Sequence, residues 1–224
     1  SISQSARDCG ISYKAAWQAL DTLTNLAGVT LVERSVGGAG GGGATLTEAG
    51  HALLHAADAM EQARAEVLAR LQGAGLHQPV LARLAVRTSM RNQWPCVVRA
   101  LEAVGPLVHV HLGGIGAAQA LALTARITQE SAQLLGLAPG LPVLALCKAT
   151  AVQVGKGQEA GDALAPNAWT GRVTRVARGE AGDEVAATLD AGVQMVGFAP
   201  PGSGLRARAR VCLRADAAAI VLAL

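Results

Sequence analysis

Hydrophobic and polar positions in the first thirty residues predict two short helices joined by a tight turn. Residues 3–8 suit a helix that ends before Gly10, because glycine readily takes the left-handed backbone found just past a helix. Ser12 is a good N-cap for a second helix over residues 13–25. The residues expected to form its buried face, spaced by three and four, are Ala16, Leu20 and Leu23. Such a pair is either a helix-turn-helix or an ordinary helical hairpin.

Two short strands are predicted next, at residues 31–34 and 44–46. Between them, residues 37–43 are glycine except for one alanine. A hairpin tip with almost no side chains can lie close to another surface, as a wing does, although glycine runs are more often linkers. The order helix, turn, helix, strand, glycine loop, strand, helix is that of a winged helix. It favours the wing over the linker.

A long helix is predicted over residues 47–72. Its apolar residues Leu53, Met60 and Val67 lie seven positions apart, a spacing that suits a partner helix. The helix either packs against its own domain or pairs with a second copy of the chain. Pairing would present two DNA-reading heads to two half-sites. We therefore expect residues 1–75 to form a winged helix-turn-helix domain with a dimerisation helix.

From about residue 80 the pattern changes to short alternating runs rich in β-branched residues. Glycine and proline turns separate these runs, as in an all-β region. The expected strands lie in residues 84–86, 96–98, 107–112 and 142–146. One short helix is expected at residues 131–135, after Thr128.

This second part of the chain repeats itself. Residues 92–94 (Asn-Gln-Trp) match residues 167–169 (Asn-Ala-Trp) at an offset of 75, and residues 147–151 match residues 213–217 at an offset of 66. We therefore expect two tandem copies, at 84–154 and 164–224, each the size of a small five-stranded OB-like barrel. The expected fold class is α+β and multidomain, with a winged helix-turn-helix before tandem β-barrels.

Composition and charge separate the two parts. A hydrophobic fraction of 51% excludes wholesale disorder, and an aromatic fraction of 2% predicts a core of Ala, Val and Leu. The net charge of +3 is uneven: residues 1–76 carry −2 and residues 77–224 carry +5. An anion site is therefore expected in the second part. In the first part only Arg7, Lys14 and Arg34 are suitably placed for DNA phosphates.

Several function classes are not expected. The four cysteines (Cys9, Cys96, Cys147, Cys212) are far apart and form no CxxC or Cys/His cluster, which favours reduced thiols and a cytoplasmic location. No Ser/His/Asp set, metal cluster or pair of carboxylates can be assembled, so neither an enzyme nor a bound metal ion is expected. No run of about 18 apolar residues predicts a membrane span.

The motifs resemble a known family. Residues 88–94 (Thr-Ser-Met-Arg-Asn-Gln-Trp), Ile127-Thr128 with Ser131, Leu135-Gly136-Leu137, Gly140 and Lys148-Ala149 resemble a molybdate-binding Mop domain. Two such domains (di-Mop) behind a winged helix with a glycine-rich wing resemble the ModE family of molybdate-responsive bacterial transcriptional regulators. The DNA-binding domain of that family is similar to residues 1–4, 10–14, 16–17 and 32–34 and the run through Gly43. The resemblance implies that the family's first helix is missing from this chain.

The resemblance implies a molybdate site made of Ser89, Met90, Arg91, Thr128, Ser131, Lys148 and Ala149. The side-chain chemistry agrees, because molybdate is a tetrahedral dianion that only accepts hydrogen bonds. Arg91 and Lys148 offer charge, and three of the other residues offer hydroxyls. In the family these groups meet at a subunit interface, so binding would need the homodimer. Met90 stands where the family usually has alanine, a change that a backbone N–H contact would tolerate.

Each of these residues also has an ordinary structural role to play. Arg91 could be a salt-bridged surface arginine, Thr128 a helix cap and Lys148 an edge-strand lysine. In the second copy, residues 164–166 (Leu-Ala-Pro) replace the Ser-x-Arg motif. Arg214 takes the place of the lysine, but Asp216 nearby would repel a dianion. No equivalent site is therefore expected there.

The resemblance also makes the helix that begins at Ser12 the DNA recognition helix. The residues expected to contact DNA are Ser12, Tyr13, Lys14, Gln18, Arg34, Gly38 and Gly40. The first functional hypothesis is a cytoplasmic, homodimeric regulator that binds operator DNA and senses molybdate, with tungstate as an alternative effector. A molybdate storage protein with a vestigial winged domain is the second hypothesis. A LysR-like sensor of an organic ligand is the third, and the chain has no long α/β effector domain to support it.

Overall fold

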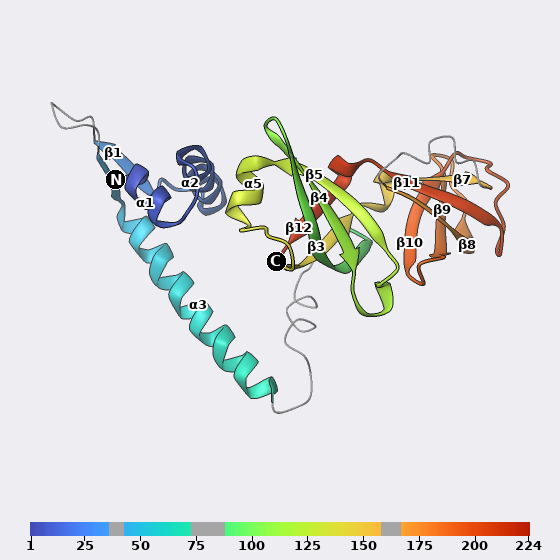
Figure 1. Ribbon diagram of the computed structural model, residues 1–224, viewed down its shortest axis with the longest axis horizontal. Coiled ribbons are helices and arrows are strands. Elements are labelled where there is room, and N and C mark those ends of the chain that lie inside the picture. Colours follow the sequence, from blue (N-terminus) through green and yellow to red (C-terminus); the bar gives the residue numbers. More distant parts are fainter. Residues whose placement is uncertain (36–42, 73–87, 158–166) are drawn as a thin grey trace. The chain divides into compact units, whose positions relative to one another are not determined.

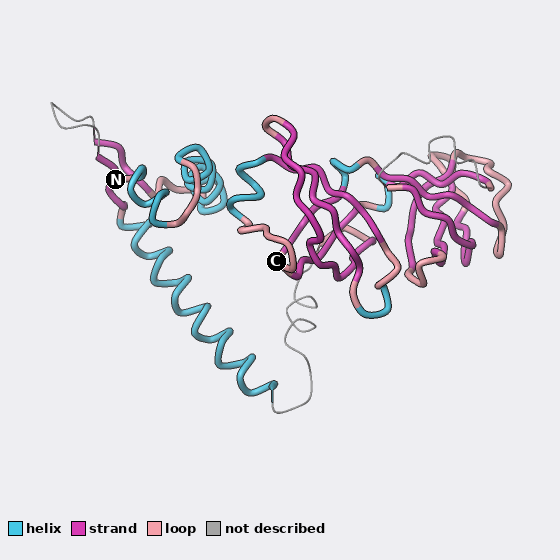
Figure 2. Tube along the Cα trace, in the orientation of Figure 1, coloured by secondary structure: helices cyan, strands magenta, loops and turns pink. Residues whose placement is uncertain are grey.

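A computed structural model of the chain describes residues 1–35, 43–72, 88–157 and 167–224 (Figures 1 and 2). The chain forms two compact units, Ser1–Arg87 and Thr88–Leu224. Helices predominate in the first unit and strands in the second, as Figure 2 shows. The α+β class predicted from the sequence is confirmed.

The first unit begins with the two predicted helices, α1 (Ile2–Asp8) and α2 (Tyr13–Ala27). Ser12 caps α2, because its hydroxyl accepts a hydrogen bond from the backbone N–H of Ala15 at 3.1 Å. Gly28 ends α2 with φ +69°, a left-handed conformation in which a side chain would be strained. Helix α2 thus runs two residues beyond the predicted end.

The predicted buried face of α2 is only partly correct. Ala15, which the spacing did not select, is fully buried, whereas Leu23 is 45% exposed. Ala16 and Leu20 are half-buried. The fully buried apolar residues among the described part of this unit are Ala6, Ala15 and Leu31. Much of the apolar surface of α2 is therefore uncovered in the single chain.

A hairpin and a long helix complete the first unit. Strands β1 (Val32–Ser35) and β2 (Gly43–Leu46) pair antiparallel, and most of the expected wing loop lies outside the described residues. Helix α3 (Glu48–Gln72) follows. Thr47 caps α3 by accepting a hydrogen bond from the N–H of Gly50 at 3.0 Å.

The second unit holds two five-stranded sets of strands. The first is the sheet β12-β6-β3-β4-β5, antiparallel throughout. Its strands are β3 (Asn92–Val104), β4 (Leu107–Gly114), β5 (Ala122–Thr128), β6 (Pro142–Cys147) and β12 (Ile220–Ala223). A 3-10 turn, η1 (Gly116–Ala118), precedes β5, and the predicted short helix α5 (Gln129–Leu134) follows it.

The second set is a closed barrel in the order β10-β7-β11-β8-β9. Its strands are β7 (Val152–Lys156), β8 (Ala168–Ala177), β9 (Asp183–Leu189), β10 (Gln194–Ala199) and β11 (Arg210–Ala215). One of the two predicted five-stranded barrels is therefore closed by hydrogen-bonded strand pairs. The other set is a five-stranded sheet.

The two sets exchange one strand each. After β6, the 3-10 turn η2 (Ala149–Ala151) leads into β7, which pairs with β11 and β10 of the barrel. After β11, the 3-10 turn η3 (Ala217–Ala219) leads into β12, which pairs with β6 of the sheet. In Figure 1 the yellow β7 accordingly lies among orange and red strands, and the red β12 among green and yellow ones. The stretch expected as the first copy, 84–154, ends inside a strand of the barrel.

The repeated Asn-x-Trp motif explains how the two copies are joined. The side chain of Asn92 exchanges two hydrogen bonds with the backbone of Val196, at 2.8 and 2.7 Å. Asn167 exchanges two with the backbone of Thr124, both at 2.8 Å. Both asparagines are almost fully buried. The asparagine side chain of each copy thus provides hydrogen-bond partners for the backbone N–H and carbonyl of one strand residue in the other copy.

The tryptophans of the motif follow the same rule. Trp94 Nε1 donates to the carbonyl of Gln194 at 3.2 Å, and Trp169 Nε1 donates to that of Ala122 at 2.9 Å. The two indole rings lie 6.3 Å apart in the common core. The sequence repeat is therefore a structural repeat with reciprocal contacts.

Candidate anion site and nucleic-acid interface

Residues expected to bind molybdate gather first at the start of β3. Asn92 pairs with Cys147 in the antiparallel ladder, so the preceding Arg91 and the following Lys148 lie at the same end of the sheet. Ser89, Arg91 and Lys148 are exposed and Met90 is half-buried, whereas Ala149 is buried at the start of η2. This end of the sheet, with residues 89–91 and 148–149, is called the first corner below.

The backbone of the first corner is held by local hydrogen bonds. The N–H of Met90 donates to Thr88 Oγ1 at 3.2 Å, and its carbonyl accepts from Gln93 Nε2 at 2.9 Å. Because the methionine side chain takes no part in these bonds, alanine could make the same backbone contacts. This fits the expectation that Met90 is tolerated at its position.

Arg91 makes a contact that the sequence did not indicate. Its Nη1 lies 3.4 Å from Glu184 Oε2 on β9 of the barrel. The other carboxylate oxygen of Glu184 accepts from Arg175 Nη2 at 2.8 Å. The guanidinium expected to hold an anion therefore already has a negatively charged partner.

Thr128 and Ser131 lie elsewhere in the sheet. Thr128 pairs with Leu107, beside the turn between β3 and β4, whereas Arg91 adjoins the other end of β3. Thr128 caps α5 by accepting from the N–H of Ser131 at 3.1 Å, and the two hydroxyls are 3.0 Å apart. Within the described residues, no hydrogen bond or ion pair joins these hydroxyls to the first corner. A single chain thus divides the expected ligands into two groups.

The structure corrects the alignment of the two copies. Trp94 pairs with Ala145 and Trp169 with Leu213, so the strands β6 and β11 correspond at an offset of 68 rather than 66. Lys148 precedes η2 and Asp216 precedes η3 with nearly the same backbone angles, φ/ψ −65°/137° and −65°/145°. The counterpart of Lys148 is therefore Asp216, and the expectation that Arg214 takes its place is wrong.

The second corner, around Asp216, has different chemistry. Asp216 pairs with Arg126 at 3.2 Å and caps η3 by accepting from the N–H of Ala218 at 2.7 Å. Beside them is a cavity of about 540 Å³ that His109 and His111 also line. A carboxylate thus stands at the position where the first corner has an ammonium group.

The expected DNA-binding residues lie at the start of α2. Ser12, Tyr13, Lys14 and Gln18 are all exposed. The ring of Tyr13 meets that of Trp17 edge-on, with centroids 6.2 Å apart. Arg34 lies in β1, and Gly38 and Gly40 fall outside the described residues. The first turns of α2 therefore leave these four side chains accessible to a partner.

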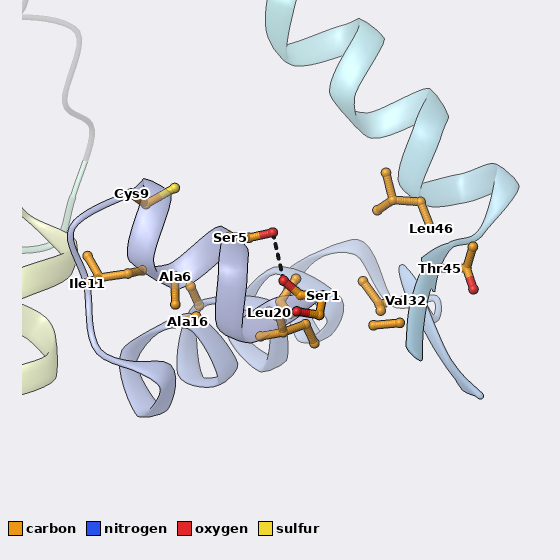
Figure 3. Close-up of a pocket in the computed structure, with 13 residues that line it drawn as sticks. Ser1, Ser5, Ala6, Cys9, Ile11, Ala16, Leu20, Val32, Thr45 and Leu46 are labelled. Atoms are coloured by element: carbon orange, nitrogen blue, oxygen red, sulfur yellow. Dashed lines mark hydrogen bonds between the residues drawn. The ribbon is translucent and has the colours of Figure 1, made fainter. Parts of the chain in front are cut away.

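A groove lies along one side of α2. It has a volume of about 360 Å³ and is bounded by α1, α2 and the β1–β2 hairpin (Figure 3). Ala16 and Leu20, two of the residues predicted to face the core, line it together with Ile11, Val32 and Leu46. The predicted inward face of α2 thus borders this groove.

The four cysteines differ in exposure, with Cys9 exposed and the other three buried. Within residues 1–35, 43–72, 88–157 and 167–224, no three His, Cys, Asp or Glu side chains are grouped to hold a metal ion. Cys96, Cys147 and Cys212 are buried, and burial raises the pKa of the Cys147 thiol to about 11. None of the described helices is long and apolar enough to cross a membrane.

Comparison with known proteins separates the same two parts. The model of the bacterial regulatory helix-turn-helix protein, lysR family, matches residues 1–51, and that of the TOBE domain matches residues 88–154. A solved structure of the cytoplasmic molybdate-binding protein ModG, with molybdate bound, is similar with a TM-score of 0.55 and 27% identity. That match covers 62% of this chain and 99% of the ModG chain.

Two curated relatives match most of the chain. The molybdenum-pterin-binding protein MopA of Rhodobacter capsulatus is 40% identical over 82% of this chain and 70% of its own length. The transcriptional regulator ModE of Yersinia pestis is 36% identical over 87% of this chain and 74% of its own length. With an N-terminal LysR-type helix-turn-helix followed by a TOBE/Mop region, the chain belongs to the ModE family.

Proposed function

We propose that this protein is a molybdate-sensing transcriptional regulator that binds operator DNA through α2 and molybdate through the Mop region. The observation that carries the proposal is the presence in one chain of an exposed helix-turn-helix and a cationic corner, in a family that includes ModE regulators. Residues 1–75 form the DNA-binding domain, with residues 47–72 as the dimerisation helix. Residues 84–154 and 164–224 form the two Mop domains.

The first corner supplies the charge for the anion. Arg91 and Lys148 are exposed beside adjacent strand ends. The Ser89 hydroxyl and the N–H of Ala149 add neutral donors, whereas the N–H of Met90 already donates to Thr88 Oγ1. Hydrogen bonds from charged donors are roughly twice as strong as neutral ones. The similarity to ModG, whose structure contains molybdate, supports the choice of anion. Tungstate has the same charge and shape and is the alternative effector.

A homodimer completes the site in this proposal. Thr128 and Ser131 do not reach the first corner of their own chain, so a second subunit brings them to it. The seam of α3 supports pairing, because Leu53, Met60 and Val67 are 38%, 73% and 51% exposed in the single chain. Anion binding between subunits would stabilise one arrangement of the dimer and thereby change operator affinity, provided the two arrangements bind the anion differently.

DNA recognition in this proposal uses α2 and the hairpin. Tyr13 and Gln18 face the base edges, Ser12 and Lys14 the phosphates, and Arg34, Gly38 and Gly40 of the hairpin the flanking backbone. A regulator of this kind acts in the cytoplasm, where its operator is.

Fluorescence anisotropy with a promoter fragment, over a salt series and with or without molybdate, tests the regulator. We expect molybdate to shift operator affinity. Lys14→Ala should reduce the salt slope by about one, and Gln18→Ala should reduce sequence discrimination by about 1–3 kcal/mol. Arg206→Ala, which removes an exposed charge from the loop between β10 and β11, is the control and should change neither.

A storage protein is the second candidate, because residues 1–76 carry a net charge of −2 and MopA is as similar to this chain as the regulators are. Storage predicts molybdate binding without any salt-dependent, sequence-specific DNA binding. Operator binding that does not respond to molybdate would contradict both candidates.

A further inference from the structure

An ion network of three residues joins the first corner to the barrel. Glu184 stands between two arginines, with Arg91 Nη1 at 3.4 Å from one carboxylate oxygen and Arg175 Nη2 at 2.8 Å from the other. The side chain of Glu184 is 24% exposed, whereas those of Arg91 and Arg175 are 53% and 58% exposed. The carboxylate is thus the better anchored member of the network.

The fold fixes the position of Glu184. It lies on β9, paired with Phe198 of β10 on one side and with Ala177 of β8 on the other. The neighbouring Asp183 and Val185 point into the barrel and are buried, so Glu184 points outward. The exposed Arg91 side chain can turn away more easily than this strand residue can move.

A carboxylate and a bound dianion compete for the same guanidinium. Both accept hydrogen bonds from Arg91, and their like charges repel when both stand beside it. The contact of 3.4 Å with Arg91 is long and exposed, so it is weak. The contact of 2.8 Å with Arg175 remains when Arg91 turns away, so Glu184 keeps a partner.

We infer that Glu184 is an internal competitor of the anion, which holds Arg91 against the barrel and sets the affinity of the first corner. This inference rests on the proposed function, because it concerns the same anion site. Molybdate displaces Glu184 from Arg91, and Arg175 retains the released carboxylate. Binding therefore loosens one link between the first corner and the barrel.

The competitor acts alike on every dianion. Each one must displace the same carboxylate, so Glu184 lowers the affinities for molybdate and sulfate by a similar factor. Their ratio depends on the donors around the anion, which Glu184 does not supply. Removing the competitor should therefore raise both affinities and leave the ratio unchanged.

Calorimetric titration of the full chain with sodium molybdate and sodium sulfate tests the inference. Glu184→Gln keeps the shape of the side chain and removes its charge, and we expect molybdate to bind roughly two- to five-fold more tightly, the range of an exposed ion pair. Glu180→Gln removes the same charge from the exposed turn before β9 and is the matched control, with no change expected. Arg175→Gln should weaken binding, because Glu184 then turns wholly to Arg91.

The outcomes separate this inference from the proposed site. If Arg91→Ala abolishes molybdate binding while Glu184→Gln leaves it unchanged or weaker, the competitor role of Glu184 is refuted and the anion site at the first corner is supported. If Arg91→Ala leaves binding unchanged, the site itself is refuted. Equal tightening by Glu184→Gln and Glu180→Gln would show a general charge effect and also overturn the competitor. In the Arg91→Ala background, Glu184→Gln should no longer tighten binding.

Discussion

The first and second corners of the Mop region share a backbone and differ in charge. Lys148 and Asp216 have nearly identical backbone angles, each precedes a three-residue 3-10 turn, and each turn leads into an exchanged strand. Lys148 is exposed beside Arg91, whereas Asp216 is paired with Arg126. The frame of the repeat thus depends on buried groups that both copies keep. Its chemistry depends on a few exposed side chains that differ.

The largest effect is expected where the two copies are most alike. Asn92→Ala and Asn167→Ala each leave a backbone N–H and carbonyl without a partner, at the half-buried Val196 and the buried Thr124 respectively. We expect a cost of about 2–4 kcal/mol in the free energy of unfolding. Urea denaturation measures it. Gln93→Ala, beside Asn92 but exposed, should cost less than about 0.5 kcal/mol. A large cost at one asparagine and none at the other would break the structural equivalence of the copies.

Giving the first corner the charge of the second should remove its anion site. Lys148→Asp replaces a cation by an anion next to Arg91, and we expect molybdate affinity to fall about a hundredfold, about 2.7 kcal/mol. Calorimetric titration measures the affinity. Asp216→Asn, which changes the charge of the second corner and keeps an acceptor for its cap, is the control. A rise in molybdate affinity in the control, where a repelling carboxylate has been removed, would place an anion at the second corner.

The barrel should also respond to acid in a way that the sheet does not. Ser203 and Arg178 donate hydrogen bonds to the buried carboxylate of Asp183, at 2.7 and 2.5 Å, and these bonds lower its pKa below the ordinary value. The corresponding residue of the sheet is the buried Val108. Because the folded-state pKa is the lower one, the stabilisation is complete above the unfolded pKa of about 4 and is lost as pH falls through the folded-state value.

Asp183→Asn tests this difference by denaturation between pH 7 and pH 3. The variant should be less stable than the parent at pH 7 and should approach it in acid, where the parent carboxylate becomes protonated. A stability difference that stays constant over the whole range would show that the charge of Asp183 does not matter.

The smallest effect is expected when the second corner receives the charge of the first. Asp216→Lys removes a turn cap and an ion pair, at a cost of about 1 kcal/mol in stability. It should create no second molybdate site, because the sequence has Pro166 rather than an arginine before Asn167. Titration that finds a second strong site in this variant would mean that Lys148 alone makes the first one.

Local chemistry could be predicted from the sequence, and long-range pairing could not. Ser12, Thr47 and Thr128 cap the helices that follow them, because capping involves residues only three positions apart. The exchange of β7 and β12 depends on ladders between distant strands, which no local pattern encodes. The offset of 66 failed for the same reason. The amino acids at positions 147–151 and 213–217 are similar, but the correct offset follows from the strand pairing, which the sequence does not show.

The candidate site shows the same division. Arg91 and Lys148 could be selected because the motif around them resembles the Mop domain, and the ladder places them side by side. Glu184 lies 93 residues from Arg91 and is one of two adjacent acidic residues at the start of an amphipathic strand, so nothing in the sequence marked it. The face of α2 was predicted from spacing alone. Ala15 is buried and Leu23 is exposed, because α2 packs against α1 and the spacing does not show which side a neighbouring element covers.

The central claim is that the two copies of the repeat share one backbone arrangement and that only the first corner binds the anion. Calorimetric titration of the full chain with molybdate tests it most directly, because the stoichiometry gives the number of corners that bind an anion. We predict one ion per chain, hence two per dimer, with binding lost in Arg91→Ala and retained in Asp216→Asn. Two ions of similar affinity per chain, or a stoichiometry that Arg91→Ala leaves unchanged, would contradict the account.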